Sequence, residues 1–517
     1  MNYCVFSENE WVYPDSAIGT RKRAEVYAAR GADGCFQILT DAVLKTGECV
    51  SATLERPGCS VQIYQLLEAH VSENSGVKTH TTTDYEAVKS FVTRKAPFDV
   101  YEVTKPLDIG ADAGRAVFFV RVDVAADAPA GEGEHVLTVR FGDSVLEIPV
   151  LIKVYNVAVP ALKDASFHMV NWIYFDTLAK HHNVEPYSDA YMKILRAYLE
   201  NQLDMRNDYL MIPRGEPVRD ADGKVIDFDF SNAIAVGNLA LEMGFSCVMG
   251  GFPIVWLTWN APELYLHWDH EIEVTTLEGF RQLKLYFTRA NEAIEKNGWR
   301  GRYQQCLMDE PQFPNAAAYR TVGAICRKCI PGIVINDPVE ASNLGGGLDI
   351  WVVKQAVYEK YLEDFKALQA MGEEVWIYTC GFPANKVMNR VIDLPLTVSR
   401  LPMWMCYKYG CPGFLHWGYH CHNEEERRDT CYRVRDRKFP AGNAHVVYIG
   451  DDRPHYGVRG HSQRTGAQDY ELLNLLGARD KEKALALVDK LCRTFDDYDP
   501  DAAKFDAVHR ELLEALG

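Results

Sequence analysis

The segment Tyr303-Gln-Gln-Cys-Leu-Met-Asp-Glu-Pro311 decides the fold assignment more than any other part of this chain. Residues 303–308 predict a short buried strand, and two adjacent carboxylates, Asp309 and Glu310, follow it at a turn marked by proline. Neighbouring side chains of a strand point to opposite faces, so both acids reach one cleft only where the strand ends and the backbone bends. Paired acids at a strand end are typical of a barrel enzyme. The alternative is that they simply begin the next helix, where acidic residues are favoured.

On both sides of this segment, from about residue 165, predicted strands alternate with predicted helices, which is the pattern of parallel βα units. The predicted strands are Phe167–Asn171, Asp208–Ile212, Phe245–Met249, Tyr303–Met308, Ile333–Asn336, Asp349–Val353, Glu374–Thr379 and Pro412–Trp417. Helical periodicity occurs at 189–204, 277–296, 315–328 and 358–371. Eight such repeats over roughly 250 residues predict an α/β fold, a (β/α)8 TIM barrel. The long aromatic connection between 245 and 300 predicts an active-site loop.

The N-terminal part has a different pattern, with short strands separated by Pro, Gly and Asp clusters. Val117–Val124 predicts one strand, and Val136–Phe141 and Val145–Tyr155 flank the turn residues 142–144 as a hairpin. We therefore predict three parts: an N-terminal β-sandwich domain over 1–158, a barrel catalytic domain over 159–440, and a C-terminal strand and helices packed on the barrel over 441–517.

Composition narrows the function classes. The chain has 517 residues, 47% of them hydrophobic and 25% charged, and its formal net charge is −17. Nucleic acids and anionic membranes require basic surfaces, so neither is expected as a partner. No stretch approaches the roughly 18 consecutive apolar residues of a membrane span. The N-terminus lacks the pattern of a signal peptide, which predicts a cytoplasmic protein unless a leader has been removed. The 14 cysteines show no disulfide spacing, which predicts reduced thiols.

If the barrel is correct, substrate-binding side chains lie where strands end. The candidates are Asn171, Trp172, Asn336, Trp351, Tyr378 and Trp417. Tryptophan faces beside carboxylates suit a sugar, because the C–H face of a pyranose stacks on an indole. Any single tryptophan is more often part of the core, since these side chains are large and mostly buried. Several at strand ends favour a carbohydrate site.

The adjacency of the two acids limits the mechanism. Most glycosidases hold two carboxyl groups across the scissile bond, about 5 Å apart or farther, and consecutive residues rarely do so. Neighbouring acids suit substrate-assisted catalysis, in which the 2-acetamido oxygen of the sugar attacks the anomeric carbon. Asp309 fits the group that orients the acetamido N–H and stays ionised. Glu310 fits the general acid/base, which must hold a proton near neutral pH and needs a raised pKa. Tyr378 could donate a hydrogen bond to the acetamido oxygen.

Four segments resemble glycoside hydrolase family 123, the β-N-acetylgalactosaminidases. They are Met308-Asp-Glu-Pro311, Val375-Trp-Ile-Tyr-Thr-Cys380, Arg400-Leu-Pro-Met-Trp404 and Gly413-Phe-Leu-His-Trp417. The resemblance implies a retaining exo-hydrolase that releases a terminal β-linked N-acetylhexosamine, most readily GalNAc, from a glycan or glycolipid, with Asp309 and Glu310 as the catalytic pair. It implies no cofactor. The C-terminal segment from Gly457 to Leu473 has His461 and Thr465 where the family usually has acidic residues, which leaves the substrate less certain than the reaction class.

Three alternatives remain open. The histidines and cysteine at 416–422, with His181 and His182, allow a metal hydrolase, although a barrel metal site usually has a His-x-His on its first strand and only His168 is present there. A non-catalytic carbohydrate-binding protein would keep the aromatic residues without needing a proton donor. A glycosidase acting on a sugar without the acetamido group would need another nucleophile, for which Asp337 is the candidate. The hexosamine configuration, the aglycone and the oligomeric state are not determined by the sequence.

Overall fold

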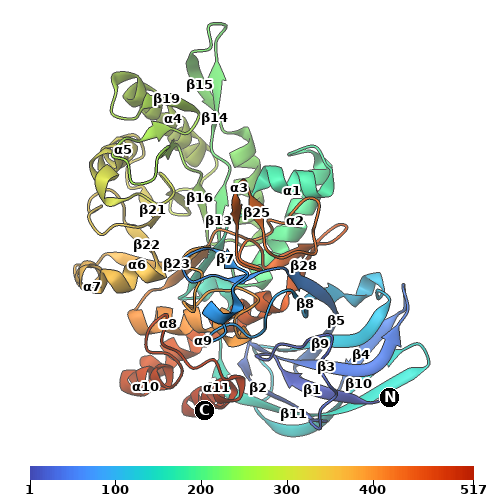
Figure 1. The fold of residues 1–517 in the computed structure, drawn as a ribbon. Coiled ribbons are helices and arrows are strands. Elements are labelled where there is room, and N and C mark those ends of the chain that lie inside the picture. Colours follow the sequence, from blue (N-terminus) through green and yellow to red (C-terminus); the bar gives the residue numbers. More distant parts are fainter. The chain divides into compact units, whose positions relative to one another are not determined.

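The computed structural model describes residues 1–517 (Figure 1). Contacts within the chain divide it into two compact units. The barrel unit comprises Phe167–Thr379 and Gly410–Trp417, and the first unit comprises Met1–Ser166, Cys380–Tyr409 and Gly418–Gly517. The C-terminal segment thus groups with the N-terminal sheets, and the loop and helix between the last two barrel strands group with them too.

The barrel unit contains one parallel sheet of eight strands that nearly closes on itself, as the sequence predicts. In the order in which they pair, the strands are β12 (His168–Asn171), β24 (Gly413–His416), β23 (Glu374–Thr379), β22 (Ile350–Lys354), β21 (Val334–Val339), β20 (Tyr303–Gln305), β16 (Cys247–Gly250) and β13 (Tyr209–Ile212). No ladder joins β12 to β13. Instead the buried Asp208 carboxylate accepts hydrogen bonds from the His168 ring (2.8 Å) and the backbone N–H of Met169 (3.2 Å), which links the two edge strands.

Seven helices and several short strands connect the barrel strands. The helices are α1 (Phe175–His182), α2 (Asp189–Asp204), α3 (Ser231–Met243), α4 (Leu277–Lys296), α5 (Ala316–Cys329), α6 (Gln355–Lys360) and α7 (Leu362–Ala370). The hairpin β14 (Glu216–Arg219) and β15 (Val225–Asp229) projects beyond the barrel strands in Figure 1. The predicted long connection holds a small sheet of β17 (Ile254–Val255), β18 (Tyr265–Leu266) and β19 (Asp269–Glu273). This sheet comes directly before α4.

Packing inside the barrel explains two of the sequence segments quoted above. The buried Trp376 ring lies 5.8 Å from that of His168 and 5.2 Å from that of Tyr209, so it joins β23 to the two edge strands. A Cβ atom at Gly413 would come within 2.1 Å of the Trp376 ring, so β24 can lie beside β23 only with glycine there. Trp376 and Gly413 are therefore a matched pair that keeps the barrel closed.

Two β-sheets of the first unit share one hydrophobic core. The larger, antiparallel sheet has the order β1 (Tyr3–Ser7), β3 (Asp33–Leu44), β9 (Gly114–Val124), β5 (Cys59–Val71), β8 (Phe98–Pro106), β28 (Pro454–Gly457) and β27 (Val447–Ile449). The smaller has the order β2 (Ala24–Arg30), β11 (Ser144–Ala158), β10 (Gly131–Phe141) and β4 (Val50–Leu54). Phe118 and Val120 of one sheet and Val139 and Ile148 of the other belong to the same buried cluster. The predicted hairpin is confirmed, since Phe141 pairs with Ser144 across a two-residue turn.

Buried ion pairs fix the helices of the first unit, which are α8 (Leu401–Tyr409), α9 (Val458–Gly477), α10 (Lys481–Leu491) and α11 (Ala502–Leu516). The Arg400 guanidinium donates two hydrogen bonds to Asp469 (2.6 and 2.8 Å), and the Trp404 indole N–H donates a third (2.8 Å). Removing one partner of such a buried pair strands the other charge and costs about 3–5 kcal/mol. The Arg400–Trp404 segment and Asp469 therefore hold this unit together.

The two departures from the family pattern lie in the same helix. His461 is buried and stacks on Phe119 at 4.4 Å, and the Thr465 hydroxyl donates to the His461 backbone carbonyl at 3.2 Å. Both residues therefore serve packing within the first unit. Separately, none of the helices is both long enough and apolar enough to cross a membrane.

Candidate active site

The acid pair lies on a bend that follows β20. The ladder ends at Gln305, three residues earlier than predicted, and 306–308 continue without strand pairing. Glu310 has φ +49°, in the left-handed region, which costs a non-glycine residue on the order of 1–3 kcal/mol. This bend frees the two side chains from strict strand alternation. The strain is offset by hydrogen bonds that hold the turn in place.

Several hydrogen bonds fix the backbone of this turn, which we define as residues 307–312. Their donors and acceptors are Leu307 N–H to the Asp337 carboxylate (2.9 and 3.0 Å), Glu310 N–H to the Pro338 carbonyl (3.1 Å), Glu340 N–H to the Pro311 carbonyl (3.2 Å), the Trp256 indole N–H to the Asp309 carbonyl (3.0 Å), and the Gln312 amide to the Glu310 carbonyl. The neighbouring strand β21 and the segment that follows it supply most of these partners. The turn is thus tied to the rigid barrel wall.

Three side chains surround Glu310. The Tyr378 hydroxyl from β23 donates to its carboxylate at 2.5 Å, and the Lys354 ammonium from the end of β22 lies 3.5 Å from the same oxygen. Lys354 also forms an ion pair with Glu340 and lies 5.8 Å from the Tyr378 ring centroid. Glu310 is half-buried, so these contacts hold one carboxyl group at the strand-end face of the barrel.

Asp309 has the perturbed pKa of the pair. Although it is exposed, surrounding protein crowds its carboxyl and reduces its hydration, and the negative charge of Glu310 adds to this effect. Together they raise the Asp309 pKa to about 8, against the opposing field of Lys354. The substrate-assisted mechanism led us to expect the raised pKa on the proton donor, Glu310. The unliganded structure places it on Asp309 instead.

Three of the six predicted substrate-binding residues lie at the strand ends beside the acids. The Tyr378 hydroxyl contacts Glu310 directly. Trp172 and Trp417 follow the paired strands β12 and β24, and the backbone N–H of Trp172 donates to the His416 carbonyl at 3.2 Å. Trp172 packs edge-to-face on Phe252 at 5.5 Å and Trp417 on Tyr174 at 6.4 Å. Trp417 is half-buried, so part of its surface stays available.

The other three predicted residues are buried. Trp351 is wholly inaccessible, because it points out of the barrel toward Phe365 of α7, and its indole N–H donates to Glu373 at 2.9 Å. Trp351 and Lys354 are three residues apart, so strand alternation sends them to opposite faces. The assignment of Trp351 to the substrate site is wrong. Asn171 and Asn336 are also fully buried, and their amides donate to Asn207 (2.7 Å) and Gln304 (2.9 Å) respectively.

Asp337 is not available as an alternative nucleophile. It is fully buried, and its carboxylate accepts from Leu307 N–H and, at 2.6 Å, from the Tyr319 hydroxyl. The predicted fifth strand ends at Asn336, but the observed ladder continues through Pro338 to Val339. The acid that follows this strand is therefore Glu340, which the sequence-based prediction missed. The apolar Val339 after Pro338 was the signal that the strand continues.

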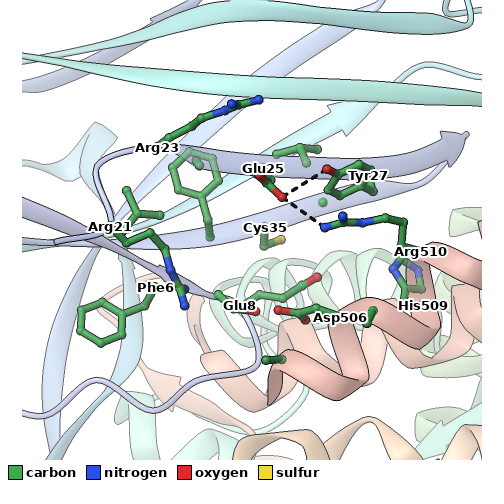
Figure 2. A pocket seen from close by; sticks show the side chains of 18 of the residues that line it. Phe6, Glu8, Arg21, Arg23, Glu25, Tyr27, Cys35, Asp506, His509 and Arg510 are labelled. Atoms are coloured by element: carbon green, nitrogen blue, oxygen red, sulfur yellow. Dashed lines mark hydrogen bonds and ion pairs between the residues drawn. The ribbon is translucent and has the colours of Figure 1, made fainter. Parts of the chain in front are cut away.

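A separate cavity of about 550 Å³ lies within the first unit, lined by β1, β2, β3 and α11 (Figure 2). Figure 2 shows Glu8 and Asp506 close together, and Arg510 paired with Glu25. Glu8 also pairs with Arg400 (3.0 Å), and burial raises its pKa to about 7. The ionisable groups of this cavity thus satisfy one another, and the cavity contains none of the acids at the barrel strand ends.

The histidines considered for a metal site do not converge. His422 contacts neighbours within the first unit, with its ring nitrogen 2.8 Å from the Val447 carbonyl and its ring 4.1 Å from that of His445. No group of three or more His, Cys, Asp or Glu side chains is arranged to hold a metal ion. All 14 cysteines are free thiols.

A family model for the catalytic domain of glycoside hydrolase 123 matches residues 172–476, more than half of the chain. The chain belongs to glycoside hydrolase family 123. This family 123 chain is therefore a glycoside hydrolase, an enzyme, and its matched region contains the acid pair, Tyr378, Trp417 and the Arg400–Asp469 ion pair.

Solved structures agree with the fold of the family 123 chain. A family 123 glycoside hydrolase from Clostridium perfringens, described for glycolipid glycan hydrolysis, matches with a TM-score of 0.73 at 11% identity, covering 100% of this chain and 96% of that one. An endo-β-1,4-mannanase from Thermotoga petrophila covers 60% of this chain and 78% of its own at 12% identity, with a TM-score of 0.39 that supports no argument. No curated protein matched by sequence.

Proposed function

We propose that this enzyme is a retaining exo-hydrolase that releases a terminal β-linked N-acetylhexosamine by substrate-assisted catalysis. The observation that carries the proposal is the pair of consecutive acids, Asp309 and Glu310, held at one strand end by the left-handed Glu310 backbone. Two adjacent carboxyl groups cannot easily flank a sugar ring as acid and nucleophile. They can, however, act on one edge of the sugar, if the nucleophile comes from the substrate itself.

In this mechanism the acetamido oxygen attacks the anomeric carbon and forms a cyclic oxazolinium-type intermediate. Asp309 accepts the acetamido N–H and offsets the positive charge that develops on that group. Glu310 donates its proton to the leaving oxygen, then takes a proton from the attacking water. Configuration is retained because the anomeric carbon is inverted twice. Tyr378 and Lys354 keep the Glu310 carboxyl in one orientation, which supports this role.

The raised pKa of Asp309 fits this scheme if the substrate moves the proton. In the unliganded enzyme Asp309 holds a proton near neutral pH, because its pKa is about 8. An acetamido N–H donated to the carboxylate favours its ionised form. Binding of the substrate would therefore transfer the shared proton from Asp309 to Glu310, where the leaving group needs it. A sugar without the acetamido group would not trigger this transfer.

The substrate class is proposed from the family. Members resembling this chain act on β-linked GalNAc, and the Clostridium perfringens relative is described for glycolipid glycans. A GalNAc residue at the non-reducing end of a glycan or glycolipid is thus the proposed substrate. Trp172 and Trp417, which follow adjacent strands, are the proposed stacking surfaces for its ring. We also propose that the two sheets of the first unit, which share a core, form a β-sandwich domain.

Hydrolysis of four aryl glycosides tests the proposed function. We expect release of the aryl group from β-GalNAc, and more slowly from β-GlcNAc, but not from β-Gal or β-Glc, which lack the internal nucleophile. A thiazoline derived from the N-acetyl sugar should inhibit competitively, since it mimics the cyclic intermediate. Hydrolysis of the unsubstituted hexosides without inhibition by the thiazoline would contradict the proposal.

A further inference from the structure

The loop from Trp256 to Ala261, which follows β17, is bound to the catalytic turn. Three hydrogen bonds connect them: the Trp256 indole N–H to the Asp309 carbonyl (3.0 Å), the Asn260 N–H to the Gln312 side chain (2.9 Å), and the Asn315 amide to the Ala261 carbonyl (3.3 Å). Gln312 in turn donates to the Glu310 carbonyl. The loop therefore keeps a fixed position relative to both acids, and any ligand that it binds lies beside them.

This loop exposes apolar surface. Trp259 is 47% and Leu257 46% exposed, and Trp256 is half-buried. The two indole rings meet edge-to-face, with centroids 5.1 Å apart and planes at 89°. Tryptophan is highly buried on average, so an exposed indole supported by a second one is unusual. A supported, exposed pair at this place suits a ligand that covers it.

The chemistry of the loop favours a sugar over a lipid. Its sequence, Trp-Leu-Thr-Trp-Asn over 256–260, places a hydroxyl and an amide among the apolar side chains, and Thr258 and Asn260 are exposed with them. Sugars need such a combination, because they present C–H faces to aromatic rings and hydroxyls to polar groups. A surface that enters a membrane would carry neighbouring basic residues, and this segment has none.

The geometry also indicates which sugar. Glu310 protonates the leaving oxygen in the proposed mechanism, so the leaving group begins beside Glu310. In an exo-hydrolase the terminal sugar enters the site first and the remainder of the glycan extends toward solvent. The exposed loop is attached to the same turn as Glu310, and is thus placed for the sugar next to the scissile bond.

We propose that Trp256 and Trp259 form an aromatic platform that binds the sugar residue of the leaving group. The platform rests on the proposed function, since it assigns a leaving-group sugar to the same site. It would make the enzyme prefer glycans over simple glycosides. Trp259 is the residue to test, because Trp256 also holds the Asp309 backbone and its loss would disturb the turn.

Three substrates with the same terminal sugar test the platform: a β-GalNAc–galactose disaccharide, octyl β-GalNAc and β-GalNAc fluoride. Trp259→Ala should lower kcat/KM on the disaccharide by about 10- to 50-fold, given the usual strength of a stacking contact in a partly desolvated site. It should change the fluoride by less than about twofold, because fluoride leaves without occupying the platform. Trp259→Phe, which keeps a ring, should restore most of the loss. Met371→Ala is a matched control, since Met371 is exposed before β23, at the opposite end of the strands.

Each outcome decides a separate point. Equal losses on all three substrates, or no loss on the disaccharide, would overturn the platform. A loss confined to the octyl glycoside would assign the surface to an alkyl aglycone and would also overturn it. If the wild-type enzyme hydrolyses none of the three, the proposed function fails and the platform fails with it.

Discussion

Asp309→Asn is expected to lower kcat/KM about 100- to 1,000-fold on aryl β-GalNAc, whether the aryl leaving group is activated or not. The amide cannot offset the charge that develops on the acetamido group, so formation of the cyclic intermediate slows for every substrate. The turn itself should survive, because the contacts that fix position 309 and its neighbours use backbone atoms. Kinetics with 2,4-dinitrophenyl and methylumbelliferyl β-GalNAc measure the effect.

The control for this change is Asp364→Asn, which makes the same substitution at an exposed position of α7, where the carboxylate accepts from Ser342 at 2.7 Å. It should leave kcat/KM within about twofold of wild type. If Asp309→Asn behaved like this control on both substrates, Asp309 would not have the orienting role.

Glu310→Gln is expected to separate substrates by leaving group. A glycoside with a poor leaving group needs the proton, so kcat/KM should fall by about 100- to 10,000-fold, the usual contribution of a general acid. For 2,4-dinitrophenyl β-GalNAc the leaving group departs without protonation, and formation of the intermediate should slow by less than about tenfold. A plot of log kcat/KM against leaving-group pKa measures this as a steeper slope than for the wild type.

Glutamine at 310 keeps the length of the side chain and a hydrogen-bond acceptor for Tyr378, so a general loss of folding is not expected. Thermal unfolding of wild type and variant checks this. Equal and small losses on both leaving groups would show that Glu310 is not the acid/base.

The barrel could be predicted from the sequence because each of its strands is a short apolar run with turn residues at both ends. Each of the eight predicted strands overlaps an observed one, and the acid pair lies just after the fourth, as expected. What failed were single-residue details. Trp351 was assigned to the wrong face, and Asn336 was taken as the end of a strand that continues to Val339. A side-chain period of two makes any such error reverse the face.

Other features of the site depend on contacts between distant segments. The left-handed Glu310 backbone is stabilised by Pro338 and Gln312 through hydrogen bonds to its backbone atoms, and no local pattern around a Glu-Pro pair predicts it. The link from Lys354 to both Glu310 and Glu340 joins the ends of three strands. The raised pKa of Asp309 likewise arises from crowding and a neighbouring charge, which only the folded chain provides.

The most direct test of substrate-assisted catalysis varies the nucleophile within the substrate. Aryl β-GalNAc derivatives carrying acetyl, fluoroacetyl, difluoroacetyl and trifluoroacetyl groups on nitrogen differ mainly in the electron density of the amide oxygen. If that oxygen attacks the anomeric carbon, kcat/KM must fall steeply with each added fluorine. If instead a residue of the enzyme is the nucleophile, kcat/KM will be nearly independent of fluorination, and that result would contradict the roles proposed for Asp309 and Glu310.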